Sequence, residues 1–357
     1  MIRLLLAGLF LLNIFTSAAQ NKLSDWTTVQ GKMEEKDFLG RKALYLSRGL
    51  AFLPASSFKE GVIEVDVAGA VMAGITFRIH NNYDYEEAYV RIVKSGNGDA
   101  MQYGPVYNDE FSWQFYQEYQ AKADYPANEG VHLKLVVHLK QAALYVVGAT
   151  KPSLLIDSLR MDTTGHVGIW SLATGAYFSN FAYRTLTATD TLPAIPMLPR
   201  ANPAAINTWQ ISQPLVFDSL PGADPRKYTA ALQWKQAGTE PDGYLNANKY
   251  VRKKVAGMGL QNSKDIVWLK YEFEEPGAGM RSLRFEYSNK AVIYINNTRL
   301  FEGDNSFLAK GPFFRGDIDK KMRINKVFLP VKKGKNTIYV ALMSLGNGWG
   351  FMGQLGN

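Results

Sequence analysis

The sequence of 357 residues contains no cysteine. Disulfide bonds and cysteine-ligated metal centres are therefore excluded, and the fold must be stabilised by buried apolar side chains. Histidine is also scarce, and none of the four histidines stands in a His-x-His or His-Glu-x-x-His pattern, so the sequence does not favour a zinc site. No window of a dozen residues shows a convincing helical period, which argues against a helical fold.

The N-terminal segment is expected to be a signal peptide and not part of the fold. Arg3 is followed by the apolar run 4–15 and by small residues at 17–19, a pattern typical of cleavage before Gln20. The alternative is a retained membrane anchor. No later apolar run approaches the about 20 residues that a spanning helix needs, so we expect no membrane span after signal removal. The mature protein would be exported to the periplasm, the cell surface or the extracellular space.

The charge of the chain is modestly basic. The formal net charge is +8, and it becomes +7 when Arg3 is removed with the signal peptide. Basic residues are scattered, and the densest cluster, at 252–254, is more typical of a solvated loop than of a nucleic-acid site. We therefore expect no nucleic-acid partner. The 338 residues that remain after cleavage are too many for one ordinary sandwich and predict two domains.

Alternation of apolar and polar residues predicts strands throughout the first half. The clearest case is 131–140, where every odd position is apolar. Further strands are predicted at 43–46, 61–67, 75–80, 86–92, 99–103, 111–116, 142–147, 165–170 and 176–184. The fold class expected from these patterns is an all-β, antiparallel β-sandwich.

A change of amino-acid composition marks the boundary between the two halves. Prolines at 193, 196, 199 and 203 fall among small and polar residues, which is typical of an extended linker. We predict a first sandwich over 20–186, a linker over 187–208 and a second domain over 209–357. Strand patterns recur at 266–273, 282–287, 291–295, 325–329 and 336–343. The second domain is therefore also expected to be a β-sandwich, of the jelly-roll type.

The stretch 75–116 concentrates residues suited to a polar ligand. Alternation places Ile75, Phe77 and Ile79 on one sheet face and Arg78 on the other. An arginine side chain binds carboxylates or donates hydrogen bonds to sugar hydroxyls, and aromatic side chains stack on pyranose rings. The candidates on the polar face or its rim are Arg78, His80, Tyr89, Arg91, Tyr103, Tyr107 and Trp113. The alternative is a solvated face whose arginines pair with nearby acidic residues.

Catalytic residues are not identified by any complete motif. Glu64 and Asp66 stand on one face of a predicted strand, and glycoside hydrolysis commonly uses two carboxyl groups about 5 to 10 Å apart. His80 is a further weak candidate for an acid or base. An exposed strand face is the favoured explanation of Glu64 and Asp66.

Loops of the second half offer two more ligand candidates. Trp349 stands in a glycine-rich segment, where it is either a stacking platform or a plug of the core, and Arg315 lies in a loop with the same ambiguity. No cofactor is expected. A structural calcium ion is the one exception left open, near acidic loop residues such as Asp304, Asp317 and Asp319.

Five short motifs carry a family resemblance in the first half. They are Gly74-Ile75-Thr76-Phe77-Arg78, Tyr89-Val90-Arg91, Ser95-Gly96-Asn97-Gly98-Asp99-Ala100, Gln102-Tyr103-Gly104-Pro105-Val106-Tyr107-Asn108 and Trp113-Gln114. On these motifs the region 61–184 resembles the concanavalin A-like lectin and glucanase superfamily, closest to secreted bacterial domains related to the 3-keto-disaccharide hydrolase-like group. The resemblance implies a sugar site on the concave sheet. The residues that it implies are Arg78, Tyr89, Arg91, Gln102 and Trp113.

Two features qualify this resemblance. Val67-Ala68-Gly69 follows Asp66 where the glucanase motif has a third acid, so glucanase-type hydrolysis is not expected. In the second half, Trp209-Gln210-Ile211-Ser212, the strand 291–297 and the segment 331–336 are similar to galactose-binding-like jelly rolls. That similarity implies a fold and no ligand.

These observations favour an exported carbohydrate-binding protein that recognises glycan on the concave face of its first sandwich. The first alternative is a hydrolase or lyase that acts on glycosides or 3-keto-glycosides. The second alternative is a structural or adhesion module of the cell surface. The sequence does not specify an oligomeric state.

Overall fold

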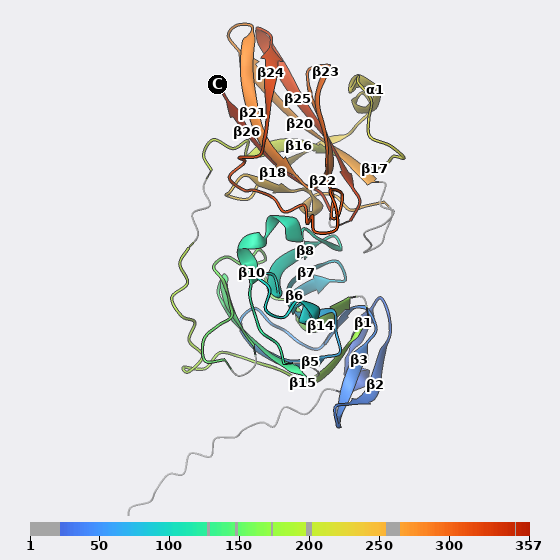
Figure 1. Ribbon diagram of the computed structural model, residues 1–357, viewed down its shortest axis with the longest axis vertical. Helices are drawn as coiled ribbons and strands as arrows, with labels where there is room; N and C mark the ends of the chain where they lie inside the picture. The colour runs from blue at the N-terminus through green and yellow to red at the C-terminus, as the bar shows by residue number, and fades with distance from the viewer. Residues whose placement is uncertain are drawn as a thin grey trace, which may run out of the picture.

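The computed structural model describes residues 22–126, 129–146, 149–172, 174–197, 202–254, 265–346 and 348–357. These residues form four antiparallel sheets that pack as two β-sandwiches, with scarcely any helix (Figure 1). The predicted all-β fold class is therefore confirmed. The predicted signal peptide, residues 1–19, lies outside the described residues. Within the described ranges, no helix has both the length and the apolar character needed to cross a membrane.

The N-terminal sandwich pairs an eight-stranded sheet with a seven-stranded sheet. The eight-stranded sheet consists of β1 (Thr27–Val29), β4 (Gly49–Phe52), β14 (His166–Leu172), β6 (Met72–Asn81), β7 (Asp84–Val90), β8 (Met101–Tyr107) and β10 (Gln120–Ala121) in spatial order, with β9 (Glu110–Phe111) beside β8. The seven-stranded sheet consists of β13 (Leu154–Ile156), β12 (Gln141–Val146), β11 (Val131–His138), β5 (Gly61–Ala68), β15 (Ala176–Arg184), β3 (Arg41–Leu46) and β2 (Met33–Phe38) in spatial order.

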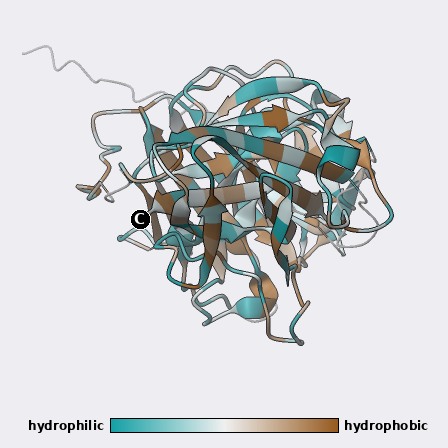
Figure 2. Cartoon of the chain, turned by 90° about the horizontal axis from the view of Figure 1, so that it is seen from above, coloured by the Kyte–Doolittle hydropathy of each residue, from teal (hydrophilic) through white to brown (hydrophobic). Residues whose placement is uncertain are grey.

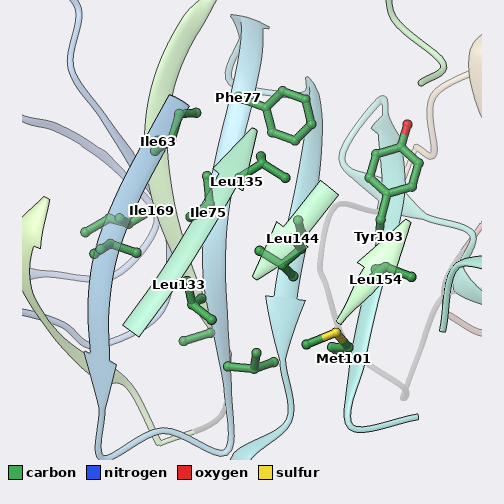
Figure 3. Packing of buried hydrophobic residues seen from close by; sticks show 14 of the residues in the cluster. Ile63, Ile75, Phe77, Met101, Tyr103, Leu133, Leu135, Leu144, Leu154 and Ile169 are labelled. Atoms are coloured by element: carbon green, nitrogen blue, oxygen red, sulfur yellow. The ribbon is translucent and has the colours of Figure 1, made fainter. Parts of the chain in front are cut away.

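Apolar side chains of the two sheets meet in one core. Ile63 and Leu135 from the seven-stranded sheet pack in the same cluster as Ile75 and Phe77 from the eight-stranded sheet (Figure 3). Hydrophobic and hydrophilic segments alternate along the strands (Figure 2), and β11 buries its odd-numbered residues as its alternation predicts. Burial of each such side chain contributes roughly 1.5–3 kcal/mol to folding.

The register of β6 shifts at Arg78. The pairing of β6 with β7 and with β14 is irregular at this point, and Arg78 has a φ of 49°, as in a β-bulge. The extra residue reverses which way the following side chain points. Phe77 lies in the core between the sheets, whereas Ile79 packs with Tyr85 in a separate cluster on the outer face. The prediction that Ile75, Phe77 and Ile79 share one face is therefore wrong for Ile79.

The C-terminal sandwich pairs a seven-stranded sheet with a four-stranded sheet. The larger sheet consists of β18 (Trp234–Gly238), β16 (Thr208–Ser212), β20 (Asp265–Glu275), β25 (Gly334–Ser344), β22 (Asn289–Ile295) and β23 (Thr298–Asn305) in spatial order, with β17 (Leu215–Val216) beside β20. The smaller sheet consists of β19 (Tyr244–Asn246), β26 (Gly350–Gly356), β21 (Gly279–Tyr287) and β24 (Asn325–Val331) in spatial order. One short helix, α1 (Arg226–Thr229), precedes β18.

The five strands predicted for the second half are all confirmed as β20, β21, β22, β24 and β25. The strand predicted at 111–116 is wrong beyond β9. Two 3-10 turns, η3 (Trp113–Phe115) and η4 (Gln117–Tyr119), occupy the segment that follows. The Phe115 ring of the first turn stacks on Tyr244 of the other sandwich at 3.8 Å, whereas Tyr119 of the second turn packs on Tyr103 of β8 at 5.1 Å. Contacts across the sandwiches therefore override the local strand pattern.

The two sandwiches pack against each other, with the second above the first and close to β7 and β8 in Figure 1. The apolar core of the first sandwich includes Tyr244, Ile318 and Met352 from the second. Buried charges also cross the boundary: Arg160 lies 2.9 Å from the Glu240 carboxylate. β15 ends at Arg184 and β16 begins at Thr208, on either side of the predicted linker; the division into domains at 186 and 209 remains a prediction.

Candidate functional site

A pocket of about 260 Å³ lies between the outer face of the eight-stranded sheet and the C-terminal sandwich. Its aromatic lining residues are Tyr89, Phe111, Trp113, Trp170 and Phe307, and its charged lining residues are Arg91, Lys94, Asp99 and Arg315. The remaining lining side chains are aliphatic or methionine. An apolar, aromatic cavity with a few convergent polar groups is the usual form of a small-molecule site. We call this cavity the interface pocket.

The floor of the interface pocket is aromatic because a glycine separates two rings. Tyr89 on β7 and Trp170 on β14 both pair with Gly74 of β6, the strand between them. A Cβ atom at position 74 would lie 2.5 Å from the Cα atom of Tyr89. Without that atom, the ring centroids of Tyr89 and Trp170 approach to 5.5 Å, and the Phe111 ring meets Tyr89 edge-on at 5.6 Å.

Arg91 follows the end of β7 and is held in one orientation by neutral acceptors. Its guanidinium donates to the Asp99 carbonyl at 2.7 Å, to the Tyr89 hydroxyl at 2.6 Å and to Gln102 Oε1 at 2.6 Å. Gln102 is fixed in turn, because its Nε2 donates to the Trp113 carbonyl at 3.0 Å. The guanidinium is thus oriented before any ligand arrives, which reduces the entropy lost on binding.

The wall opposite the floor is shared between the two sandwiches. Trp113 on η3 meets Phe307 of the C-terminal sandwich edge-to-face at 6.0 Å, and the Arg315 guanidinium lies 5.2 Å from the Trp113 ring centroid. The Asp99 carboxylate lies between two cations of this wall, because it accepts hydrogen bonds from Lys94 at 2.6 Å and from Arg315. The interface pocket therefore requires both sandwiches.

The ionisation of the lining residues follows from these contacts. Burial raises the pKa of Asp99, but the Lys94 hydrogen bond and the nearby Arg315 charge outweigh burial, so the pKa lies below its ordinary value. Asp99 is therefore ionised at neutral pH. Burial raises the pKa of Tyr89, and its phenol stays protonated.

A second carboxyl group lies two residues before Tyr89 on the same face of β7. Glu87 is buried, and neither of its carboxylate oxygens has a hydrogen-bond partner among the described residues. Burial raises its pKa to about 8, although the Arg91 charge acts in the opposite direction. Glu87 is therefore largely protonated at neutral pH.

The structure brings four of the sequence candidates together in the interface pocket: Tyr89, Arg91, Trp113 and Arg315. Gln102 does not line the pocket, but it orients Arg91. Arg315 was a candidate of the second domain, and the structure places it at the site of the first. These side chains come from three separate segments of the chain, which sequence periodicity does not bring together.

The structure places Arg78 outside the interface pocket. The bulge turns its side chain into the protein, where it is fully buried. Its guanidinium donates to the Lys59 carbonyl at 2.9 Å and to the carbonyls of Leu139 and Met161, and it lies 3.5 Å from the Glu86 carboxylate. The expectation that Arg78 and Arg91 share one ligand-binding face is therefore corrected, because Arg78 connects three loops of the sandwich through their carbonyl groups.

Other candidates also lie outside the interface pocket. His80 is exposed and contacts the Thr163 hydroxyl, and the Tyr107 hydroxyl donates to the Arg160 carbonyl at 3.4 Å. Tyr103 is buried, and its hydroxyl donates to Glu86 at 2.6 Å.

The acidic candidates stand on the outer face of β5, in the seven-stranded sheet on the opposite side of the core. Asp66 pairs there with Arg41 at 2.7 Å and with His132 at 2.8 Å. Only a depression of about 10 Å³ lies beside it, which is roughly the space of one water molecule. Glu64 has the same outward orientation and is half-buried. The structure therefore brings neither acid to the interface pocket.

The loop candidates of the second half have structural partners. Trp349 is 1% exposed and belongs to the apolar core of the C-terminal sandwich, so its side chain fills the core and offers no surface to a ligand. Asp304, Asp317 and Asp319 pair separately with Lys290, Arg315 and Arg323. The described residues contain no group of three or more metal-ligating side chains.

Sequence reasoning missed three aromatic residues of the interface pocket: Phe111, Trp170 and Phe307. The alternation of β14 places Trp170 on the face opposite Ile169, so the sequence contained a signal for Trp170. Phe307 lies in a loop of the other sandwich, and no local pattern connects it with Tyr89.

No protein-family model and no curated protein sequence matches the chain. Solved structures are similar over about half of it. The carbohydrate-binding module CBM66 from Bacillus subtilis is 20% identical with a TM-score of 0.34, and the match covers 45% of this chain and 96% of that one. A β-glucanase from Bacillus licheniformis is 11% identical with a TM-score of 0.32, covering 47% and 95%. A putative glycosyl hydrolase from Parabacteroides distasonis is 12% identical with a TM-score of 0.33, covering 46% and 89%. At these values the similarities identify neither a family nor a ligand.

Proposed function

We propose that this protein is an exported carbohydrate-binding protein whose ligand occupies the interface pocket. The observation that carries the proposal is the aromatic floor of Tyr89 and Trp170 beside the oriented guanidinium of Arg91. Aromatic faces pack against the C–H faces of sugar rings, while guanidinium groups donate to ring substituents. A cavity of about 260 Å³ lies slightly below the roughly 300–1,000 Å³ of most ligand sites, which suits a small ligand of one or two sugar residues.

Binding is favoured over hydrolysis by the distribution of carboxylates. Glycoside hydrolysis commonly uses two carboxyl groups that flank the scissile bond. The interface pocket has one lining carboxylate, Asp99, and Lys94 and Arg315 both engage it. Glu64 and Asp66 lie on the other sheet. The hydrolase alternative suggested by the resemblance to 3-keto-disaccharide hydrolase-like domains therefore lacks an acid pair at this site.

The proposal is tested by titrating the mature protein with a panel of neutral and acidic oligosaccharides in a calorimeter. Trp113→Ala removes an aromatic wall and is expected to weaken binding about tenfold or more, as for a central aromatic contact. Phe328→Ala is the matched control, because Phe328 is 59% exposed on β24 and outside the interface pocket. Equal affinity of Trp113→Ala and the control, or no binding to any saccharide, would contradict the proposal.

A further inference from the structure

Arg91 is a buried cation that forms no ion pair with a carboxylate of the described residues, although Asp99 and Asp317 lie close enough to interact with its charge. Its exposed fraction is 7%, and no carboxylate of the described residues lies within 4 Å of its guanidinium. Its three hydrogen bonds go to a backbone carbonyl, a phenol and an amide, all of them neutral. A guanidinium has five N–H donors, so two of them are left for a ligand. Arg78, also buried on this sheet, differs because it lies beside the Glu86 carboxylate.

The interface pocket as a whole is cationic. Arg91, Lys94 and Arg315 face one lining carboxylate, Asp99, which gives a formal charge of +2. The Asp99 carboxylate is already shared between Lys94 and Arg315, and its hydrogen bond with Arg91 is through the backbone carbonyl. Asp317 lies 3.4 Å from Arg315 outside the lining, and counting it still leaves an excess of +1.

Glu87 does not supply the missing charge. It lies near Arg91 on β7, but burial raises its pKa to about 8 even with Arg91 beside it. The carboxyl is therefore largely neutral at pH 7, and it does not neutralise the positive charge of Arg91. An unpaired buried charge is costly, and a ligand that supplies the opposite charge removes that cost.

We propose that the ligand of the interface pocket is an anionic saccharide, whose carboxylate or sulfate group binds between Arg91 and Lys94 while its ring packs on the aromatic floor. This inference rests on the proposed function and specifies its ligand class. Guanidinium–carboxylate hydrogen bonds are charge-assisted and roughly twice as strong as neutral ones. Lys94 is the more accessible of the two cations, because its side chain is 41% exposed.

The test compares matched sugars that differ in one group. Wild-type protein is titrated in a calorimeter with glucose, glucuronate and glucose 6-sulfate, and with galactose and galacturonate. At least one acidic sugar is expected to bind about tenfold more tightly than its neutral counterpart, the difference between charged and neutral hydrogen bonds. The uronate and sulfate arms show which acidic group the pocket prefers.

Single substitutions test which residues cause the preference for acidic over neutral sugars. Arg91→Gln is expected to reduce the acidic-to-neutral affinity ratio to about two or less, since the ratio depends on that charge. Arg226→Gln removes the same charge from an exposed position on α1 and is expected to leave the ratio unchanged. If Arg91→Gln does not fold, the acidic-to-neutral affinity ratio of Lys94→Gln is compared with that of the wild type. Lys94→Gln is expected to lower this ratio by about threefold.

Three outcomes would overturn the inference. If neutral sugars bind as tightly as their acidic counterparts, the anionic ligand class is wrong and the carbohydrate-binding function stands. If the preference persists in Arg91→Gln, or in Lys94→Gln where that variant decides, the site is wrong. If no sugar of either class binds, the proposed function fails together with the inference.

Discussion

Two arginines on neighbouring segments of one sheet are both buried, but their partners differ. Arg78 is surrounded by three backbone carbonyls and the Glu86 carboxylate, whereas Arg91 has only neutral acceptors and faces the interface pocket. The first is a structural contact and the second has donors left for a ligand. The role of an arginine therefore depends on what satisfies its charge.

Replacing Arg78 is expected to cost stability and not affinity. In Arg78→Met the Glu86 carboxylate loses its cation inside the core, and removal of one partner of a buried pair costs about 3–5 kcal/mol. Chemical denaturation of the variant would measure this loss, with Arg226→Met as the exposed control. The sugar affinity of the folded Arg78→Met protein should equal that of the wild type. A loss of sugar affinity without a loss of stability would show that Arg78 belongs to the binding site.

The buried carboxyl of Glu87 predicts a pH dependence of stability. Its pKa is raised from 4.5 to about 8 in the folded protein, so the folded state holds a proton that the unfolded state has released between these values. Stability should therefore fall as pH rises from about 5 to 8.5, by up to roughly 5 kcal/mol from this group. Glu87→Gln is expected to flatten the profile, measured as the free energy of unfolding at each pH.

The control for this prediction is Glu34→Gln, a change at a half-exposed carboxyl. Its profile should follow the wild type across the same pH range. Identical slopes for wild type and Glu87→Gln would show that Glu87 does not carry a raised pKa.

At the scale of elements, alternation predicted strands well and side-chain direction less well. β11, β20 and β25 lie where their patterns place them, because each buries one face against a partner sheet. The bulge at Arg78 turns the Ile79 side chain at the end of β6 to the other face of the sheet, and no residue type in this segment predicts a bulge. Short edge strands such as β18 were missed since few of their residues are buried.

The interface pocket was predictable only in part. Tyr89, Arg91 and Trp113 belong to motifs of one sandwich, so local patterns and the family resemblance identified them. Phe307 and Arg315 reach the same cavity through packing of the two sandwiches, which depends on contacts distant in sequence. Periodicity reports which face a residue occupies and contains no information on which other element covers that face.

At the scale of the whole molecule, buried charges join the two sandwiches. Glu240 lies 2.9 Å from both Arg160 and Lys249 and accepts from the Tyr116 hydroxyl at 2.8 Å. Burial raises the pKa of Glu240, but the charges of Arg160, Lys249 and Lys320 outweigh burial and hold it at about 2. The sandwiches are thus expected to unfold together, and the interface pocket to persist only in the intact chain.

Scanning calorimetry of the full chain tests this coupling. The wild-type protein should show one cooperative transition. Glu240→Gln should destabilise that single transition by about 3–5 kcal/mol, because it removes the buried carboxylate that pairs with Arg160 and Lys249. Gln236→Glu, at an exposed position on β18, is a surface control that should change stability little. Two separate transitions in the wild type would show that the sandwiches are independent.

The proposed function places the sugar in the interface pocket. The most direct measurement is a crystal structure of the protein soaked with the saccharide that binds most tightly in solution. We expect electron density for a sugar ring against Tyr89 and Trp170, with an acidic group beside Arg91. The C-terminal sandwich has a second cavity, of about 390 Å³, which Trp234 and Tyr250 line. Density in that cavity, or on the outer face of β5 beside Asp66, would contradict the proposal.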